Sequence, residues 1–383
     1  MADLSFIKRS PTGDSFWATH PVIQVLARRR VVAAEETEYI RCAVSLVSAA
    51  VPRSYEEHFW KKARRLEPHA EQCWSHLIDG KWGSKEPDFS ELNSIARLFR
   101  QVGRWEKAAR LNRIIELGVK AQLRNESRME FLAGVLNDLG LVYSSQRKFN
   151  NALQKYNESL LLRRQLGAPP IDDSSMTTAY NIAVVHILMG NRGEALPRLY
   201  EVESYFAEHT TDEQGLMGKE RKALYLRIQN DIGEVLLKEG YVTDATHLFN
   251  KMKSHAEILG DSHPITVSIK MNLGRAHTQL HDFPTAEVLF REVITKYTEW
   301  WGRRRPETMR AVSELAVTFI ERAKSETGAG RSGKSPLQKA ENLLVEALGF
   351  YTDTYGPDSD PVRDIRRDLE LISKMRKDDG FQG

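Results

Sequence analysis

The sequence is poor in cysteine, in long apolar runs and in net charge, and each shortage excludes a class of protein. Its two cysteines, Cys42 and Cys73, are too few for a disulfide framework or, by themselves, for a four-ligand zinc site. That scarcity favours a reducing compartment, and because no secretory signal opens the chain we expect a cytoplasmic protein. No run approaches the roughly 18 apolar residues of a membrane span, so no membrane partner is predicted.

The charge balance argues against a nucleic-acid partner. Lys and Arg number 55 against 52 Asp and Glu, which gives a net charge of +3. This surplus is too small to attract a polyanion over the whole surface. Any electrostatic preference must therefore come from a local group of side chains.

An internal repeat is the dominant pattern of the chain. In five segments a small residue is followed twelve positions later by alanine; the pairs are Ala96 and Ala108, Gly140 and Ala152, Ala183 and Ala195, Gly233 and Ala245, and Gly274 and Ala286. Two antiparallel helices approach closely only where small residues mark their crossing point, so each segment predicts a helical hairpin. A single hairpin cannot bury its apolar stripe, so the hairpins must stack.

A sixth unit keeps the pattern with a longer turn. Its small residues, Ala316 and Ala340, are separated by 24 residues because a Gly/Ser-rich insertion lies between them. Downstream, residues 361–377 place Val362, Ile365 and Leu369 on one helical face with charge elsewhere, which predicts a capping helix. Residues 378–383 are expected to fray.

These motifs resemble the tetratricopeptide family, specifically its longer-period branch typified by kinesin light chains. The resemblance covers residues 89–360, with Asn before the small residue and linkers of the Gly-x-x-His-Pro type at 260–264, 302–306 and 356–361. Only the first linker keeps the His-Pro pair. The resemblance implies an all-α, right-handed superhelical solenoid of about six hairpins, with an N-terminal helical cap and a C-terminal capping helix.

Residues 1–88 are helical in pattern but lack the repeat. They resemble the junction between the winged helix and the repeats in fungal NB-ARC/STAND regulators; the counterparts are His20, Pro21, Val22, Ala27, Arg28, Glu67, Pro68 and His69. Leu26 stands where such regulators often carry tryptophan. This resemblance implies the sensor end of a regulatory NTPase whose nucleotide-binding domain is missing here.

Three motifs suggest chemistry, and for each a structural interpretation is favoured. Residues 328–335, GAGRSGKS, satisfy the Walker A pattern but follow a helix instead of a buried strand, so we expect an inserted turn. His69, Cys73 and His76 share a helix face but lack a fourth metal ligand. Residues 300–307, WWGRRRPE, fall where a repeat linker belongs. We therefore predict no catalytic residue, no metal and no cofactor.

The remaining candidate site is the concave face of the repeats, which the first helix of each hairpin lines. The predicted peptide-binding residues are Asn93, Arg97, Arg100, Asn137, Leu141, Asn181, Val184, Arg227, Asn230, Lys238, Asn272, Arg275 and Arg310. An amide offers a donor and an acceptor together, which suits an extended peptide backbone. The alternative, which the sequence favours equally, is that these Asn side chains bond to neighbouring helices and never meet a ligand.

The sequence therefore predicts a non-enzymatic scaffold, an adaptor or sensor, that binds a protein or peptide. Its arginines against few inward acids predict a ligand with acidic residues beside apolar anchors. The alternative is a sensor fragment of a STAND-type regulatory NTPase. A purely structural role in an assembly is a weaker third hypothesis.

Overall fold

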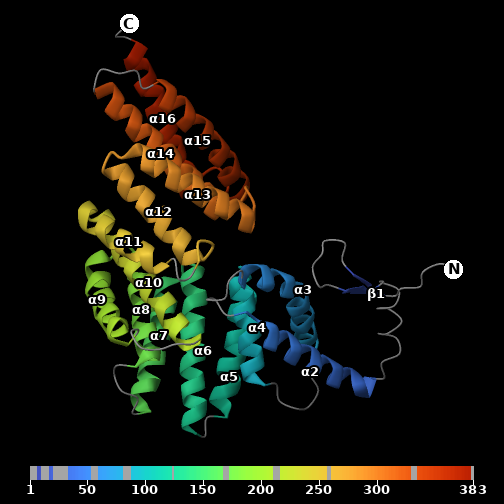
Figure 1. Ribbon diagram of the computed structural model, residues 1–383. Coiled ribbons are helices and arrows are strands. Elements are labelled where there is room, and N and C mark those ends of the chain that lie inside the picture. The colour runs from blue at the N-terminus through green and yellow to red at the C-terminus, as the bar shows by residue number, and fades with distance from the viewer. Residues whose placement is uncertain are drawn as a thin grey trace, which may run out of the picture. The chain divides into compact units, whose positions relative to one another are not determined.

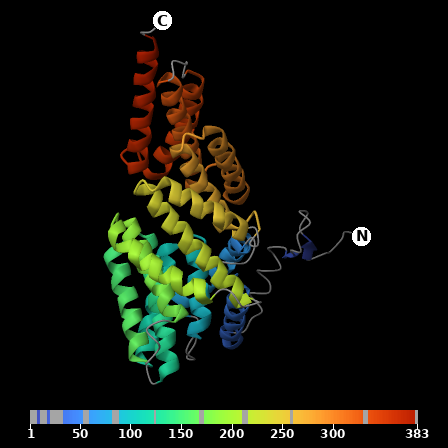
Figure 2. The same cartoon turned by 60° about the vertical axis from the view of Figure 1, so that its left-hand side comes forward.

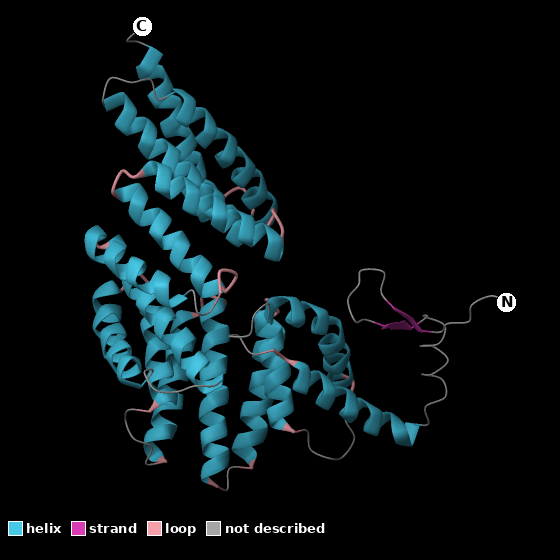
Figure 3. Cartoon of the chain, viewed as in Figure 1, coloured by secondary structure: helices cyan, strands magenta, loops and turns pink. Residues whose placement is uncertain are grey.

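The computed structural model shows an almost entirely helical chain (Figures 1 and 3). It describes residues 7–9, 17–19, 33–52, 59–80, 88–122, 125–166, 172–209, 216–256, 260–328 and 334–380. Two short strands, β1 (Ile7–Arg9) and β2 (Trp17–Thr19), pair antiparallel with Ile7 opposite Thr19. The sequence analysis does not predict this strand pair. His20 to Arg28, the first part of the STAND-like junction, lies outside the described residues.

The chain divides into two compact units. The first comprises Met1–Pro52 and Lys62–Gln122, and the second comprises Arg53–Lys61 and Leu123–Gly383. The first unit contains α2 (Ala33–Ala50), α3 (Phe59–Ile78, from Lys62 onward), α4 (Phe89–Gln101) and α5 (Trp105–Ala121). Helices α4 and α5 form the first hairpin, with Ala96 and Ala108 buried between them.

The second unit is a stack of helical hairpins in chain order (Figures 1 and 2). Its helices are α6 (Glu126–Ser145), α7 (Phe149–Gln165), α8 (Asp173–Leu188), α9 (Arg192–His209), α10 (Leu216–Lys238), α11 (Val242–Ala256), α12 (Pro264–Gln279), α13 (Phe283–Trp301), α14 (Pro306–Gly328), α15 (Lys334–Tyr355) and α16 (Asp360–Gly380). Together with α4 and α5 they give six hairpins in the described part of the chain. The predicted all-α solenoid is confirmed.

The crossing points explain why small residues recur in the first helices. A Cβ atom added to Gly140 would lie 2.5 Å from the ring of Tyr156, and one added to Gly233 would lie 2.4 Å from the ring of Phe249. Gly274 faces Phe290 in the same way. Each glycine therefore makes room for the aromatic ring that lies four residues after the repeat alanine on the second helix.

The linkers before α12 and α14 have the same backbone conformation at their glycine and the same hydrogen bond to it. Gly260 and Gly302 have φ angles of +89° and +92°, in the region that only glycine adopts without strain. One turn into each following helix, a threonine hydroxyl donates to that glycine's carbonyl, Thr266 to Gly260 and Thr308 to Gly302, both over 3.0 Å. His263 caps α12 by accepting from the amide of Ile265.

Helix α16 packs on α15 and α14 with one face only. It buries Val362, Ile365 and Ile372 and exposes Arg363, Asp364, Arg366 and Arg367. None of the described helices combines the length and apolar character that would let it cross a membrane.

Candidate functional site

The predicted site residues divide between the two units. Asn93, Arg97 and Arg100 lie on α4 in the first unit, all partly buried. Arg97 approaches the hydroxyl of Ser94 at 3.5 Å. The other ten residues lie on the first helices of the hairpins in the second unit.

The asparagines of the second unit bond to one another between neighbouring first helices. The side-chain amide of Asn181 donates to the carbonyl oxygen of Asn137 over 3.0 Å, which joins α8 to α6. Asn272 donates to Asn230 over 3.0 Å in the same way, which joins α12 to α10, and both side chains are buried. These contacts favour the structural alternative that the sequence left open for the Asn ladder.

Several predicted cations have acidic partners. The Nε and Nη2 groups of Arg275 donate to Glu314 over 2.8 and 2.5 Å, and its Nη1 donates to Asn272. Lys238 donates to Glu234 over 2.7 Å. Few inward acids are expected from the sequence, and Glu314 is not among the predicted residues; the packing of α14 against α12 brings it to Arg275.

The pKa of Glu234 reflects this pairing. Burial opposes its ionisation, but the hydrogen bond from Lys238 and the charges of Lys238, Arg275 and Arg310 outweigh burial and lower the pKa.

Arg227 and Arg310 are exposed, whereas Leu141 and Val184 are half-buried. Within the second unit, the cationic character of this face is therefore concentrated at the exposed guanidinium groups.

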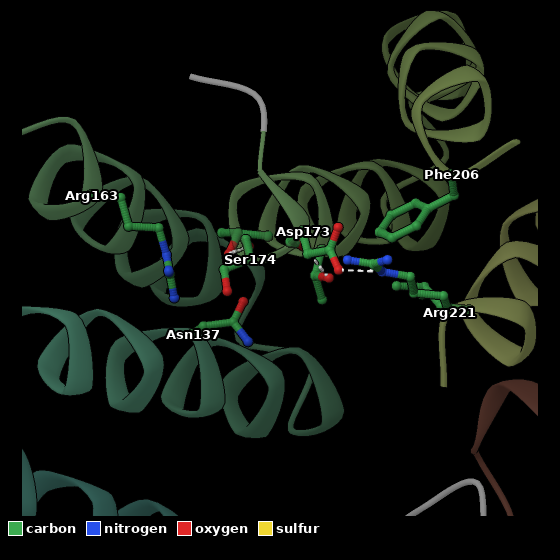
Figure 4. Close-up of a pocket in the computed structure, with 9 residues that line it drawn as sticks. Asn137, Arg163, Asp173, Ser174, Phe206 and Arg221 are labelled. Carbon is green, nitrogen blue, oxygen red and sulfur yellow. Dashed lines mark hydrogen bonds and ion pairs between the residues drawn. The ribbon is translucent and has the colours of Figure 1, made fainter. Parts of the chain in front are cut away.

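A cavity of about 250 Å³ opens among the first helices of the second, third and fourth hairpins (Figure 4). Its lining comes from α6 to α10 and comprises Asn137, Arg163, Asp173, Ser174, Thr177, Thr178, Phe206, Arg221 and Leu224. Of these residues, the sequence analysis predicts only Asn137 as a site residue.

Two arginines reach this cavity from opposite sides of the first turn of α8 (Figure 4). The Nε group of Arg221 donates to Asp173 Oδ2 over 2.6 Å, and the hydroxyl of Tyr205 donates to Asp173 Oδ1 over 2.8 Å. Burial is the main cause that raises the pKa of Tyr205 to about 12, and its hydrogen bond to Asp173 is the second. Both oxygens of Asp173 are thus occupied, so this carboxylate holds Arg221 in place.

Arg163 is the most buried cation of the cavity, with 5% of the residue exposed. Its Nη1 group donates to Glu130 of α6, and its Nε atom is buried without a hydrogen-bond partner. Its guanidinium points toward Asn137 and Ser174 (Figure 4). Because Arg163 belongs to a second helix, which the repeat pattern assigns to the outer side, sequence reasoning missed it.

The chemical character of the cavity follows from these bonds. Asn137 accepts from Asn181 through its oxygen, while the hydroxyls of Thr177 and Thr178 donate to main-chain oxygens of α8. The polar groups that line the cavity include guanidinium and amide donors, beside the apolar surfaces of Phe206 and Leu224. The cavity is therefore suited to a carboxylate with an apolar neighbour.

The motifs considered for metal or nucleotide do not come together as sites in the described residues. His69, Cys73 and His76 lie on α3, and no cluster of three or more potential metal ligands occurs in the described ranges. Burial raises the pKa of Cys73 to about 11, which keeps its thiol protonated. The Walker-like segment runs between α14 and α15, and residues 329–333 lie outside the described residues.

Comparison with known proteins agrees with the fold. A family model described as tetratricopeptide repeat matches residues 266–299, which cover most of α12 and α13. No curated protein matches the chain in sequence. The resemblance to tetratricopeptide repeats is thus confirmed.

Three solved structures illustrate the likeness. A STAND protein with a tetratricopeptide repeat sensor from Pyrococcus horikoshii is 14% identical, with a TM-score of 0.52, over 97% of this chain and 54% of that one. NprR in complex with its cognate peptide NprX is 13% identical, with a TM-score of 0.50, over 93% and 92%. A kinesin light chain-like repeat protein from Podospora anserina is 16% identical, with a TM-score of 0.42, over 59% and 97%. At these identities the first two show a shared fold and nothing more.

Proposed function

We propose that this chain is a non-enzymatic scaffold, an adaptor or sensor, that holds a peptide segment against the first helices of the second unit. The observation that carries the proposal is the cavity beside the first turn of α8, where Arg163 and Arg221 converge with Asn137. NprR, which shares the fold, is described in complex with a peptide. The ligand would be an extended or helical segment that places an acidic side chain in the cavity.

The charge of the cavity supports an acidic residue over a neutral one. It is lined by two guanidinium groups and one carboxylate, both oxygens of which already accept hydrogen bonds, while Glu130, outside the lining, is the partner of Arg163. A guanidinium pairs with a carboxylate through a planar fork, and such charge-assisted bonds are about twice as strong as neutral ones. Phe206 and Leu224 would contact an apolar residue next to the acid.

Selection from an octapeptide library displayed on phage, followed by calorimetry on the enriched peptides, tests the proposal. We expect enrichment of Asp or Glu beside a large apolar residue, with affinity that falls as salt rises. Arg221→Gln should weaken binding by roughly tenfold, because it removes one charge-assisted contact. Arg192→Gln, which removes an exposed cation paired with Glu239 on another face, is the matched control.

Arg163→Gln is a second variant. Because Arg163 is buried, circular dichroism is needed to show that this variant still folds. Thr177→Phe fills the cavity without removing a charge and should also abolish binding. Enriched peptides that bind all three variants as well as the parent would rule out this cavity as the site.

A second candidate is the sensor part of a STAND-type regulator. It is favoured by the alignment of 97% of this chain with 54% of the Pyrococcus horikoshii protein, although that likeness concerns the fold alone. Sequencing the full-length transcript distinguishes the two. An in-frame upstream P-loop next to an NB-ARC-like domain would support the regulator, and its absence would favour the free scaffold.

A further inference from the structure

A second cavity, of about 280 Å³, lies between α7, α8 and α9. Its lining comprises Asn157, Leu160, Arg163, Arg164, Ser175, Met176, Ala179, Ile182, Arg198 and Glu201. Apart from the adjacent pairs Arg163/Arg164 and Ser175/Met176, the residues from α7 and α8 are spaced three or four positions apart, so each helix turns one face to the cavity. Helices α7 and α9 are the second helices of consecutive hairpins, and Arg163 is the one residue that this lining shares with the first cavity.

Small side chains on α8 leave this space open. Ala179 lies between the larger Met176 and Ile182 in the sequence, Ser175 precedes Met176, and both small side chains line the cavity. Leu160 completes an apolar wall with Met176 and Ile182. These residues consequently offer apolar surface to a hydrocarbon group.

The lining of the cavity also carries cationic side chains. The guanidinium of Arg163 is directed to the first cavity (Figure 4), so the other charged side chains of the lining are Arg164, Arg198 and Glu201, two cations and one carboxylate. The described hydrogen bonds of Arg198 to the main chain and carboxylate of Glu194 both start from its Nη1 group. A guanidinium carries five N–H donors, so Arg198 keeps donors for a ligand.

We propose that this outer cavity is a second binding site, for a small amphipathic carboxylate with a single negative charge. The carboxylate of the ligand would bind Arg198 and Arg164, while its apolar body would cover Leu160, Met176 and Ile182. The volume lies at the lower end of the range for small-molecule sites, and it is too small for a helix of a partner protein.

Calorimetry with octanoate as the probe tests this site. Octanoate should bind, while octylammonium, which has a similar apolar body and the opposite charge, should bind at least about tenfold more weakly. Inorganic phosphate, which lacks the apolar body, should not bind measurably.

Three variants locate the binding. Arg198→Gln should weaken octanoate binding by about tenfold, and Ala179→Leu should abolish it by filling the cavity. Arg221→Gln, which alters only the first cavity, should leave octanoate affinity unchanged, so this proposal and the proposed function can fail independently. Absence of octanoate binding, equal affinity for octylammonium, or full binding by Ala179→Leu would overturn the proposal.

Discussion

The side-chain amide of Asn272 donates to the carbonyl oxygen of Asn230 over 3.0 Å and so joins the first helices of two successive hairpins. The side-chain amide of Asn230 in turn approaches the hydroxyl of Ser268 at 3.3 Å. Arg275 in turn donates to the oxygen of Asn272. A residue that sequence reasoning offers to a ligand therefore has its polar groups largely occupied within the solenoid.

Replacing Asn272 by alanine should destabilise the protein. The change leaves the oxygen of Asn230 and a donor of Arg275 without their partner in a buried setting, which costs roughly 1–3 kcal/mol. Urea unfolding followed by circular dichroism measures this loss. Asn342→Ala, at an exposed position in the middle of α15, is the control and should change stability by less than about 0.5 kcal/mol. Equal effects of the two substitutions would contradict a structural role for the Asn pair.

Two glycines of α6 should respond to alanine in opposite directions. At Gly140 a Cβ atom would lie 2.5 Å from the ring of Tyr156, so Gly140→Ala should cost about 1–3 kcal/mol through overpacking. At Gly134 nothing lies within 4 Å of an added Cβ, so Gly134→Ala should stabilise by up to about 1 kcal/mol through helix propensity. Thermal unfolding of both variants measures these changes in stability. A stabilised Gly140→Ala protein would contradict the close contact between Gly140 and Tyr156.

The stability of the second unit should depend on pH through Asp231. Burial raises the pKa of this carboxyl from 3.8 to about 6, although the hydrogen bond from Tyr180, over 2.7 Å, opposes the rise. A raised pKa means that the folded state binds the proton more tightly than the unfolded state. The free energy of unfolding should therefore fall as pH rises from about 4 to about 6, by at most about 3 kcal/mol.

Asp231→Asn should remove this part of the pH dependence. As pH rises from about 4 to about 6, the free energy of unfolding of the variant should therefore increase relative to that of the parent. Tyr180→Phe should move the window to higher pH, because it removes a hydrogen bond that favours the ionised carboxylate. Urea titrations at several pH values provide the measurement. Parallel pH profiles for the parent and Asp231→Asn would show that Asp231 does not titrate in this range.

Lys334→Ala should leave both stability and nucleotide affinity unchanged. Lys334 is the first residue of α15 and the preceding described element is the helix α14, whereas a phosphate-binding loop leaves a buried strand. Titration with a fluorescent ATP analogue and Mg²⁺ checks this expectation. Tight, magnesium-dependent binding that disappears in the variant would establish a nucleotide site in this turn.

The fold could be predicted from the sequence because each hairpin is a local unit. The recurrence of a small residue such as Gly233 and an alanine such as Ala245 marks a contact between helices that are neighbours along the chain. The candidate site could be predicted only in part. Asn137, one of the predicted peptide-binding residues, lines the cavity, but Arg163 and Arg221 belong to positions that the repeat pattern does not distinguish from other polar positions.

The sequence by itself determined the helices, their pairing and the positions where two helices touch, because side-chain size and helical periodicity fix these locally. Only the tertiary structure decided which polar groups remain available to a ligand. Glu314 lies 39 residues after Arg275, and Asp173 lies 48 before Arg221, yet packing brings each pair into contact. Whether an arginine binds a ligand or a neighbouring carboxylate depends on such contacts, and no local pattern in the chain encodes them.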